Sequence, residues 1–210
     1  TDKLIVARTR KFIESKLNSD LGFPEKAKPE NIYQGVDHFG DFKTTEEIYK
    51  AFEKLNLTAY QPSIYTHKDL KAGLIEAAAD WDDNINREMF LVKMMCILFM
   101  KRLESSWWSL LKTVEKVKEK HDDTLKMVIA FETKGEDGII RNGDIVDEED
   151  YDEQIIRRRE IKVSDIKNLA GFKKALEEDC AQLAKIYIGL LDFETKYRTG
   201  AERDLKLDEL

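Results

Sequence analysis

Proline, glycine and cysteine are scarce in this sequence, and each scarcity excludes a class of protein. The chain of 210 residues has 3 Pro and 10 Gly, which disfavours sandwiches, propellers and collagen-like chains, since these need frequent turns or a glycine repeat. Two cysteines, Cys96 and Cys180, are too few for a disulfide framework or a zinc cage. They suit a reducing compartment, so we expect inert core thiols and a cytoplasmic location.

The sequence also lacks a membrane span and the motifs of common active sites. Its most apolar run, residues 89–100, is twelve residues long and contains Lys93, whereas a span needs roughly 20 residues. The glycine-rich phosphate loop and the Gly-x-Ser-x-Gly elbow are missing, and the three histidines lie far apart. We therefore expect no membrane contact, no catalytic residue and no metal site in this chain.

Charged residues, in contrast, are abundant and unevenly placed. They make up 37% of the chain, well above the usual quarter, which favours long solvated helices around a modest core. Residues 132–153 contain ten acidic side chains against Lys134 and Arg141, a net charge of −8 in a chain that carries −7. We interpret residues 132–153 as an acidic loop insert. Because the remainder is slightly positive, the acidity does not argue against a nucleic-acid partner.

Hydrophobic periodicity predicts a mainly α-helical fold. Residues 44–55 combine a capping box, Thr44 with Glu47, with apolar residues at helical spacing. Residues 86–120 contain no Gly or Pro, and their apolar seam predicts one long helix, or two in line. Residues 171–196 predict a second long helix, whose apolar stripe is Phe172, Leu176, Cys180, Leu183, Tyr187, Leu190 and Leu191. We therefore expect a helical bundle built on one or two long helices, with shorter helices packed around them.

Strand content is expected to be marginal. Residues 138–146 could form a small β-hairpin that turns at Asn142-Gly143, although a mobile acidic loop is equally compatible with the flanking charge. In the long helix, the adjacent Trp107 and Trp108 point to different sides. We expect Trp107 to continue the apolar seam into the core, and Trp108 to serve an interface or a stacking surface.

Three segments, in order along the chain, resemble landmarks of bacterial Swi/Snf-type superfamily II (DEAD/DEAH-box-like) helicases. Residues 4–13, Leu-Ile-Val-Ala-Arg-Thr-Arg-Lys-Phe-Ile, followed by Gly-Phe-Pro-Glu-Lys at 22–26, resemble the stretch after the first RecA-like lobe. Residues 98–106 contain Lys-Arg-Leu-Glu-Ser-Ser, which closely resembles a helix found between the lobes. Residues 203–210 look like the helix that leads into the second lobe.

The resemblance implies what this chain does. It would be a single helical inter-lobe domain, residues 1–210, that forms part of a larger helicase. The two flanking lobes of the parent protein would bind ATP and Mg²⁺, so this chain alone would bind no cofactor and hydrolyse no ATP. It would brace the lobes of a DNA translocase and contact the nucleic-acid backbone, with double-stranded DNA as the expected partner.

Phosphate contacts need lysine and arginine. The expected nucleic-acid contacts are Arg8, Arg10, Lys11, Lys101, Arg102, Arg157 and Arg158. The residues expected at the lobe interface are Glu104, Ser105 and Trp108. Each charged candidate could instead belong to an ordinary solvated helix face. Two rival functions stay open: a non-catalytic protein–protein interaction module with exposed apolar faces, and a hydrolase whose carboxylates converge in a pocket.

Overall fold

The computed structural model describes residues 28, 44–67, 83–141 and 160–201. The chain separates into two units, Thr1–Tyr33 and Gln34–Leu210, and apart from Lys28 the described residues belong to the second. This described part contains four α-helices, short 3₁₀ turns and one two-stranded sheet, so the predicted mainly α fold is confirmed. Its helices include none that is long and apolar enough to cross a membrane.

Helix α2 (Thr45–Glu53) forms where the capping box predicts it. The Thr44 Oγ1 atom accepts a hydrogen bond from the Glu47 backbone N–H at 3.1 Å, which satisfies one of the free donors of the first turn. Phe52 lies at the end of the buried face and is 1% exposed. Its ring stacks on Phe99 with the centroids 4.6 Å apart, so α2 is fixed to the bundle by aromatic contact.

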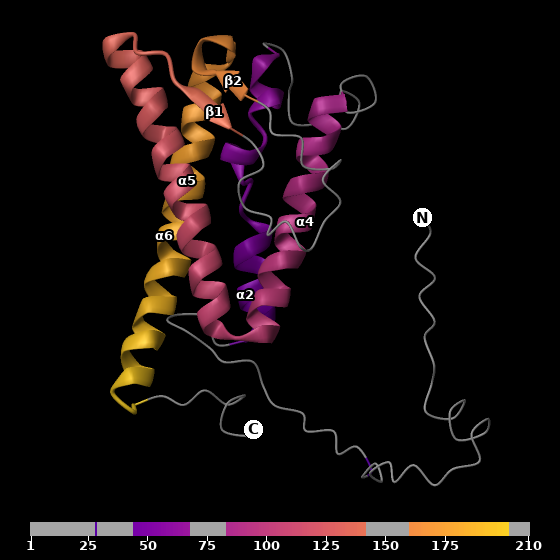
Figure 1. Ribbon diagram of the computed structural model, residues 1–210, viewed down its shortest axis with the longest axis vertical. Coiled ribbons are helices and arrows are strands. Elements are labelled where there is room, and N and C mark those ends of the chain that lie inside the picture. Colours follow the sequence, from indigo (N-terminus) through magenta and orange to yellow (C-terminus); the bar gives the residue numbers. More distant parts are fainter. Residues whose placement is uncertain (1–27, 29–43, 68–82, 142–159, 202–210) are drawn as a thin grey trace, which may run out of the picture. The chain divides into compact units, whose positions relative to one another are not determined.

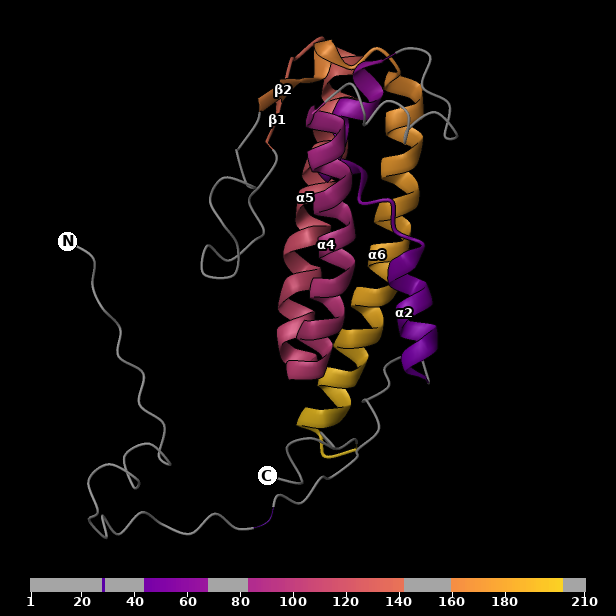
Figure 2. The same cartoon turned by 90° about the vertical axis from the view of Figure 1, so that its right-hand side faces the viewer.

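Residues 86–120 are helical apart from Ser106, but they form neither one continuous helix nor two helices in line. Helices α4 (Asp83–Ser105) and α5 (Trp107–Lys134) meet at Ser106, which is the N-cap of α5 and has an extended backbone with φ −167° and ψ 151°. The Ser106 Oγ atom accepts from the Ser109 N–H at 3.0 Å. The two helices lie side by side (Figures 1 and 2), because both turn their seams toward one core.

Helix α6 (Leu169–Arg198) is the predicted second long helix and packs along α5 (Figure 2). Asn168 caps it by accepting from the Gly171 N–H at 3.1 Å. The expected apolar stripe ran through Cys180 and Tyr187, but both are half-buried. Of the other members, Phe172, Leu176, Leu183 and Leu190 are buried as expected, and the buried face is completed by Asp179, Ile186, Gly189 and Phe193.

The small sheet pairs β1 (Ile139–Arg141) antiparallel with β2 (Glu160–Lys162). The first strand lies within the residues predicted to form a hairpin, of which residues 142–146 lie outside the described residues. Its partner in the sheet is residues 160–162. Burial explains the choice, since Ile140 and Ile161 are paired in register and are 1% and 3% exposed.

Part of the expected acidic loop belongs to the ordered fold. Helix α5 runs to Lys134 and ends at Gly135, whose φ of 71° is the left-handed conformation that glycine adopts readily. The Asp137 carboxylate accepts from the Ser164 N–H at 3.0 Å and from its hydroxyl at 2.7 Å, and these bonds lower the pKa of Asp137. Residues 142–153 lie outside the described residues.

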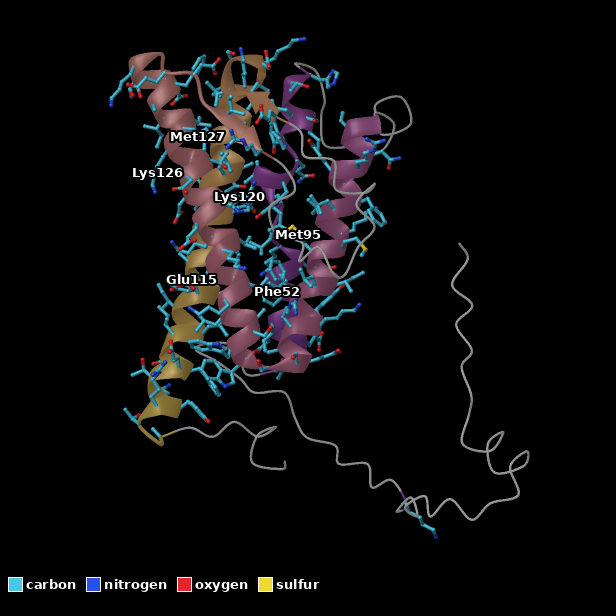
Figure 3. All side chains as sticks on the ribbon, in the orientation of Figure 1. Phe52, Met95, Glu115, Lys120, Lys126 and Met127 are labelled. Carbon is cyan, nitrogen blue, oxygen red and sulfur yellow. The ribbon has the colours of Figure 1, made fainter. Side chains whose placement is uncertain are left out.

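The apolar core forms two clusters along the bundle. One joins α2, α4, α5 and α6, and includes Phe52 and Met95 (labelled in Figure 3). The other joins α5, α6 and the small sheet. The irregular stretch Asn56–Thr66, here called the wedge segment, contains the 3₁₀ turns η1 (Thr58–Tyr60) and η2 (Pro62–Thr66). It contacts all three long helices, so its position sets how they are spaced.

We predict that Ser106→Ala destabilises the protein by about 1 kcal/mol, because the first turn of α5 loses its cap. Ser106→Asp should retain nearly full stability, since its carboxylate accepts the same hydrogen bond. Urea unfolding followed by circular dichroism measures both. Equal stability of Ser106→Ala and wild type would contradict this account of the α4–α5 corner.

Candidate functional site

The structure brings five of the sequence-predicted residues together where α4 turns into α5. Lys101, Arg102, Glu104 and Ser105 occupy the last turns of α4, and Trp108 is in the first turn of α5. Arg102 is half-buried and the other three α4 residues are exposed, while Trp108 is 41% exposed. This helix corner therefore presents a cationic and aromatic surface to solvent.

The two tryptophans divide as the sequence predicts. Trp107 is 6% exposed, and its ring centroid lies 5.2 Å from that of Phe193 and 5.6 Å from that of Tyr197 on α6. Trp108 meets the Trp107 ring edge-on at 5.6 Å and has the Lys112 ammonium 5.0 Å from its own ring centroid. Trp107 thus anchors the corner in the core, while Trp108 stays available at the surface.

An exposed face of α4 leads into this corner. Phe90 and Ile97, seven residues apart on the same side of the helix, are 46% and 51% exposed. Lys93 and Lys101 are exposed on the same face. Helix α4 contains three acidic residues, Asp83, Glu88 and Glu104, and the middle one, Glu88, is buried. The α4 face is therefore both apolar and cationic.

The remaining predicted phosphate contacts cannot be related to this corner. Arg8, Arg10 and Lys11 precede the described residues, and Arg157 and Arg158 fall between β1 and β2, outside the described residues as well. The first and last landmarks of the family resemblance lie outside them too. Their roles stay predictions.

The strongest polar feature of the fold is a buried carboxylate that sequence reasoning missed. Asp179 on α6 is 2% exposed, and it accepts hydrogen bonds from the backbone N–H groups of Asn56 at 2.8 Å and Thr58 at 2.7 Å. Between these amides, the fully buried Leu57 adopts a left-handed conformation with φ 52°. That conformation costs about 1–2 kcal/mol for a residue with a Cβ atom, and the flanking amides form a concave anion site that the carboxylate fills.

A second buried carboxylate holds the other part of the wedge segment. Glu88 on α4 is 5% exposed and accepts from the Ser63 backbone N–H at 2.9 Å and from the Ser63 hydroxyl at 2.7 Å. One acid from α4 and one from α6 therefore hold the same irregular segment. We call these contacts the carboxylate clamp. The sequence signal for the clamp was a charged residue on an apolar helical stripe, since Asp179 lies between Leu176 and Leu183.

His121 lies against this clamp. Its side chain is fully buried, with Nδ1 2.8 Å from the Val117 carbonyl oxygen and Nε2 3.7 Å from Asp179 Oδ2. Burial lowers the pKa of His121 below its ordinary value, which keeps the ring neutral at neutral pH. Among the described residues, no three His, Cys, Asp or Glu side chains are placed to hold a metal ion.

Both cysteines lie in environments that disfavour the thiolate. Cys96 and Cys180 are half-buried free thiols, and burial raises the pKa of Cys96. Burial, followed by the hydrogen bond with Asp122, raises the pKa of Cys180 to about 12. Thiolates are the reactive species, so neither environment favours a cysteine nucleophile.

A shallow groove between α5 and β1 bears on the hydrolase alternative. Its wall includes Glu119, Asp123 and Arg141. Asp123 is paired with Lys126 at 2.8 Å, and Arg141 with Glu160 at 3.0 Å. Because these charges compensate one another at the exposed surface, the groove does not favour a pair of catalytic carboxylates.

Comparison with known proteins assigns no family to this chain. No protein-family model matches the sequence, and searches of curated proteins and of solved structures found no match.

We predict that Asp179→Ala destabilises the protein by about 3 kcal/mol, because two buried N–H groups lose their acceptor. Asp179→Asn should cost less, since its amide oxygen can still accept one hydrogen bond. The matched control is Glu177→Ala on the exposed side of α6, which should change stability by less than about 0.5 kcal/mol. Urea unfolding gives the free energy of unfolding of the three variants. Similar losses of unfolding free energy in the two alanine variants would refute the clamp.

We also predict that Cys180 resists alkylation. With its pKa raised to about 12, iodoacetamide at about pH 8 should label it roughly a hundredfold more slowly than the same cysteine in urea-unfolded protein. Mass spectrometry of tryptic peptides separates Cys180 from Cys96. Labelling of folded Cys180 at the unfolded rate would show that the thiol is not held in this environment.

Proposed function

We propose that this chain is the helical inter-lobe module of an ATP-dependent, helicase-like DNA translocase. In this role it braces two RecA-like lobes and contacts the nucleic-acid backbone. The observation that supports the proposal is the helix corner: the Lys-Arg-Leu-Glu-Ser-Ser motif ends α4 with Lys101, Glu104 and Ser105 exposed, next to the partly exposed Trp108. The motif thus supplies a surface, which suits a contact with another domain or with nucleic acid.

The proposed role is mechanical and needs a stiff body. Helix α5 has 28 residues and α6 has 30, so at 1.5 Å per residue each is about 40–45 Å long. The carboxylate clamp and the shared core fix α4 against this pair. Such a body can keep two lobes at a set spacing and pass a movement of one lobe to the other. ATP and Mg²⁺ would be bound by the lobes, and this chain supplies no reacting group.

Contacts to nucleic acid would come from the cationic α4 face. Lys93 and Lys101 are exposed, and lysines that neutralise phosphates give affinity that falls with salt and does not depend on base sequence. The half-buried Arg102 is better suited to fixing α4 within the module. Double-stranded DNA is the proposed partner.

A second function has its own support. Phe90 and Ile97 are 46% and 51% exposed, and exposed apolar side chains in a row on one helix face are typical of protein-binding surfaces. The chain would then be a non-catalytic interaction module that binds a protein through α4. Such binding would depend on buried apolar area and would change little with salt.

Fluorescence anisotropy with a labelled DNA duplex tests the proposed function. We predict binding by the full chain at about 50 mM salt that weakens strongly at about 200 mM. Lys101→Glu should weaken binding roughly tenfold at the lower salt, because one phosphate contact becomes a repulsion. Lys174→Glu, on an exposed position of α6, is the control, because it lowers the net charge by the same amount as Lys101→Glu. No binding at the lower salt, or equal effects of both variants, would contradict nucleic-acid contact through α4.

A further inference from the structure

We propose that His121 makes the docking of the wedge segment sensitive to pH: protonation of its Nε2 atom releases the amides of Asn56 and Thr58 from Asp179. This device goes beyond the proposed function and would operate in this chain whatever partner it binds.

The arrangement of the imidazole is the first support for the device. Nδ1 lies 2.8 Å from the Val117 carbonyl oxygen, which can only accept, so Nδ1 carries the proton of the neutral ring. Nε2 therefore presents its lone pair, is buried, and has no hydrogen-bond partner among the described residues. It lies 3.7 Å from Asp179 Oδ2, the same oxygen that accepts from the Thr58 N–H at 2.7 Å.

The groups around His121 decide which way the device works. Asp179 approaches from α6, Tyr60 of η1 places its ring centroid 5.7 Å from that of the imidazole, and Lys120 and Asp122 are neighbours on α5. Burial opposes the charged ring most strongly, and Lys120 adds to this, while the Val117 carbonyl, Asp179 and Asp122 favour the charged form. Burial prevails, so the pKa of docked His121 lies below the ordinary 6.5.

The direction of the pH dependence follows from this shift. Well above pH 6.5, the ordinary pKa of a released histidine, the ring is neutral whether the wedge segment is docked or released, and docking is fully stable. Below that pH the released form takes up a proton that the docked form resists, so docking weakens until the pH passes the lower pKa of the docked form. A protonated Nε2 also becomes a charged donor that competes with Thr58 for Asp179 Oδ2.

Release would affect the whole bundle. Without the carboxylate, the left-handed backbone at Leu57 loses the acceptor that both flanking amides share. Because η1 contacts α4, α5 and α6, the spacing of the three helices would then be less strictly defined. Mild acid would thus convert a stiff module into a looser one while the helices themselves persist.

Amide hydrogen exchange measured by NMR on the full chain tests the device. Protection factors, which correct for the intrinsic pH dependence of exchange, should fall at least about tenfold for Asn56 and Thr58 between about pH 7.5 and about pH 5. Amides in the middle of α5, such as that of Val114, should keep the same protection factors over this pH range. His121→Phe should abolish the pH effect at Asn56 and Thr58, whereas His67→Asn, which removes another histidine, should leave it intact.

Two results would overturn the proposal. The first is a set of protection factors at Asn56 and Thr58 that does not change with pH, or that changes equally in His121→Phe. The second guards against a variant that does not fold, and uses wild-type protein: the ring resonances of His121 and the amide shifts of Thr58 are followed through the same titration. A shared midpoint below pH 6.5 supports the device, and different midpoints contradict it.

Discussion

The structure depends on the hydrogen bonds that the Asp179 carboxylate accepts from the amides on either side of Leu57. A chain that leaves α2 must turn sharply to enter the space between the long helices, and Leu57 makes that turn in a conformation that disfavours a branched side chain. The buried carboxylate supplies the charge that holds these amides, and their bonds in turn make its burial possible. Glu88 repeats the arrangement from α4 with Ser63.

This interaction connects the fold with the proposed function. Lys101 and Trp108 are exposed at the helix corner. A contact there can pass a movement to the rest of the module only if the packed helices behind the corner are held rigidly. Trp107 anchors the corner between α5 and α6, and the wedge segment keeps α4 in place at a distance from it. His121 places a titratable group beside the charge that holds this body together, so the same contact that stiffens the module offers a way to loosen it.

The features that the sequence predicts correctly are those decided by interactions between residues close together in the chain. The capping box of Thr44, the helical periodicity of α5 and α6, and the opposite sides taken by the two tryptophans all depend on residues a few positions apart. The α4–α5 corner was missed because the apolar seam continues through Ser106 without a change of step, although serine is a good N-cap. The clamp was missed because Asp179 is separated from Thr58 by more than a hundred residues. The predicted stripe of α6 also included Cys180 at the turn where the buried residue is Asp179.

In this structure the buried carboxylates set the position of α4 relative to α6. Double electron–electron resonance tests the role of these carboxylates. It measures the distance between spin labels attached at the exposed positions 93 and 177, in protein whose two native cysteines have been replaced. The account predicts one narrow distance distribution for the otherwise unchanged chain and a broad or displaced one when Asp179 becomes alanine, with helix content preserved. The same narrow distribution in both proteins would contradict it, because α4 would then be held without the clamp.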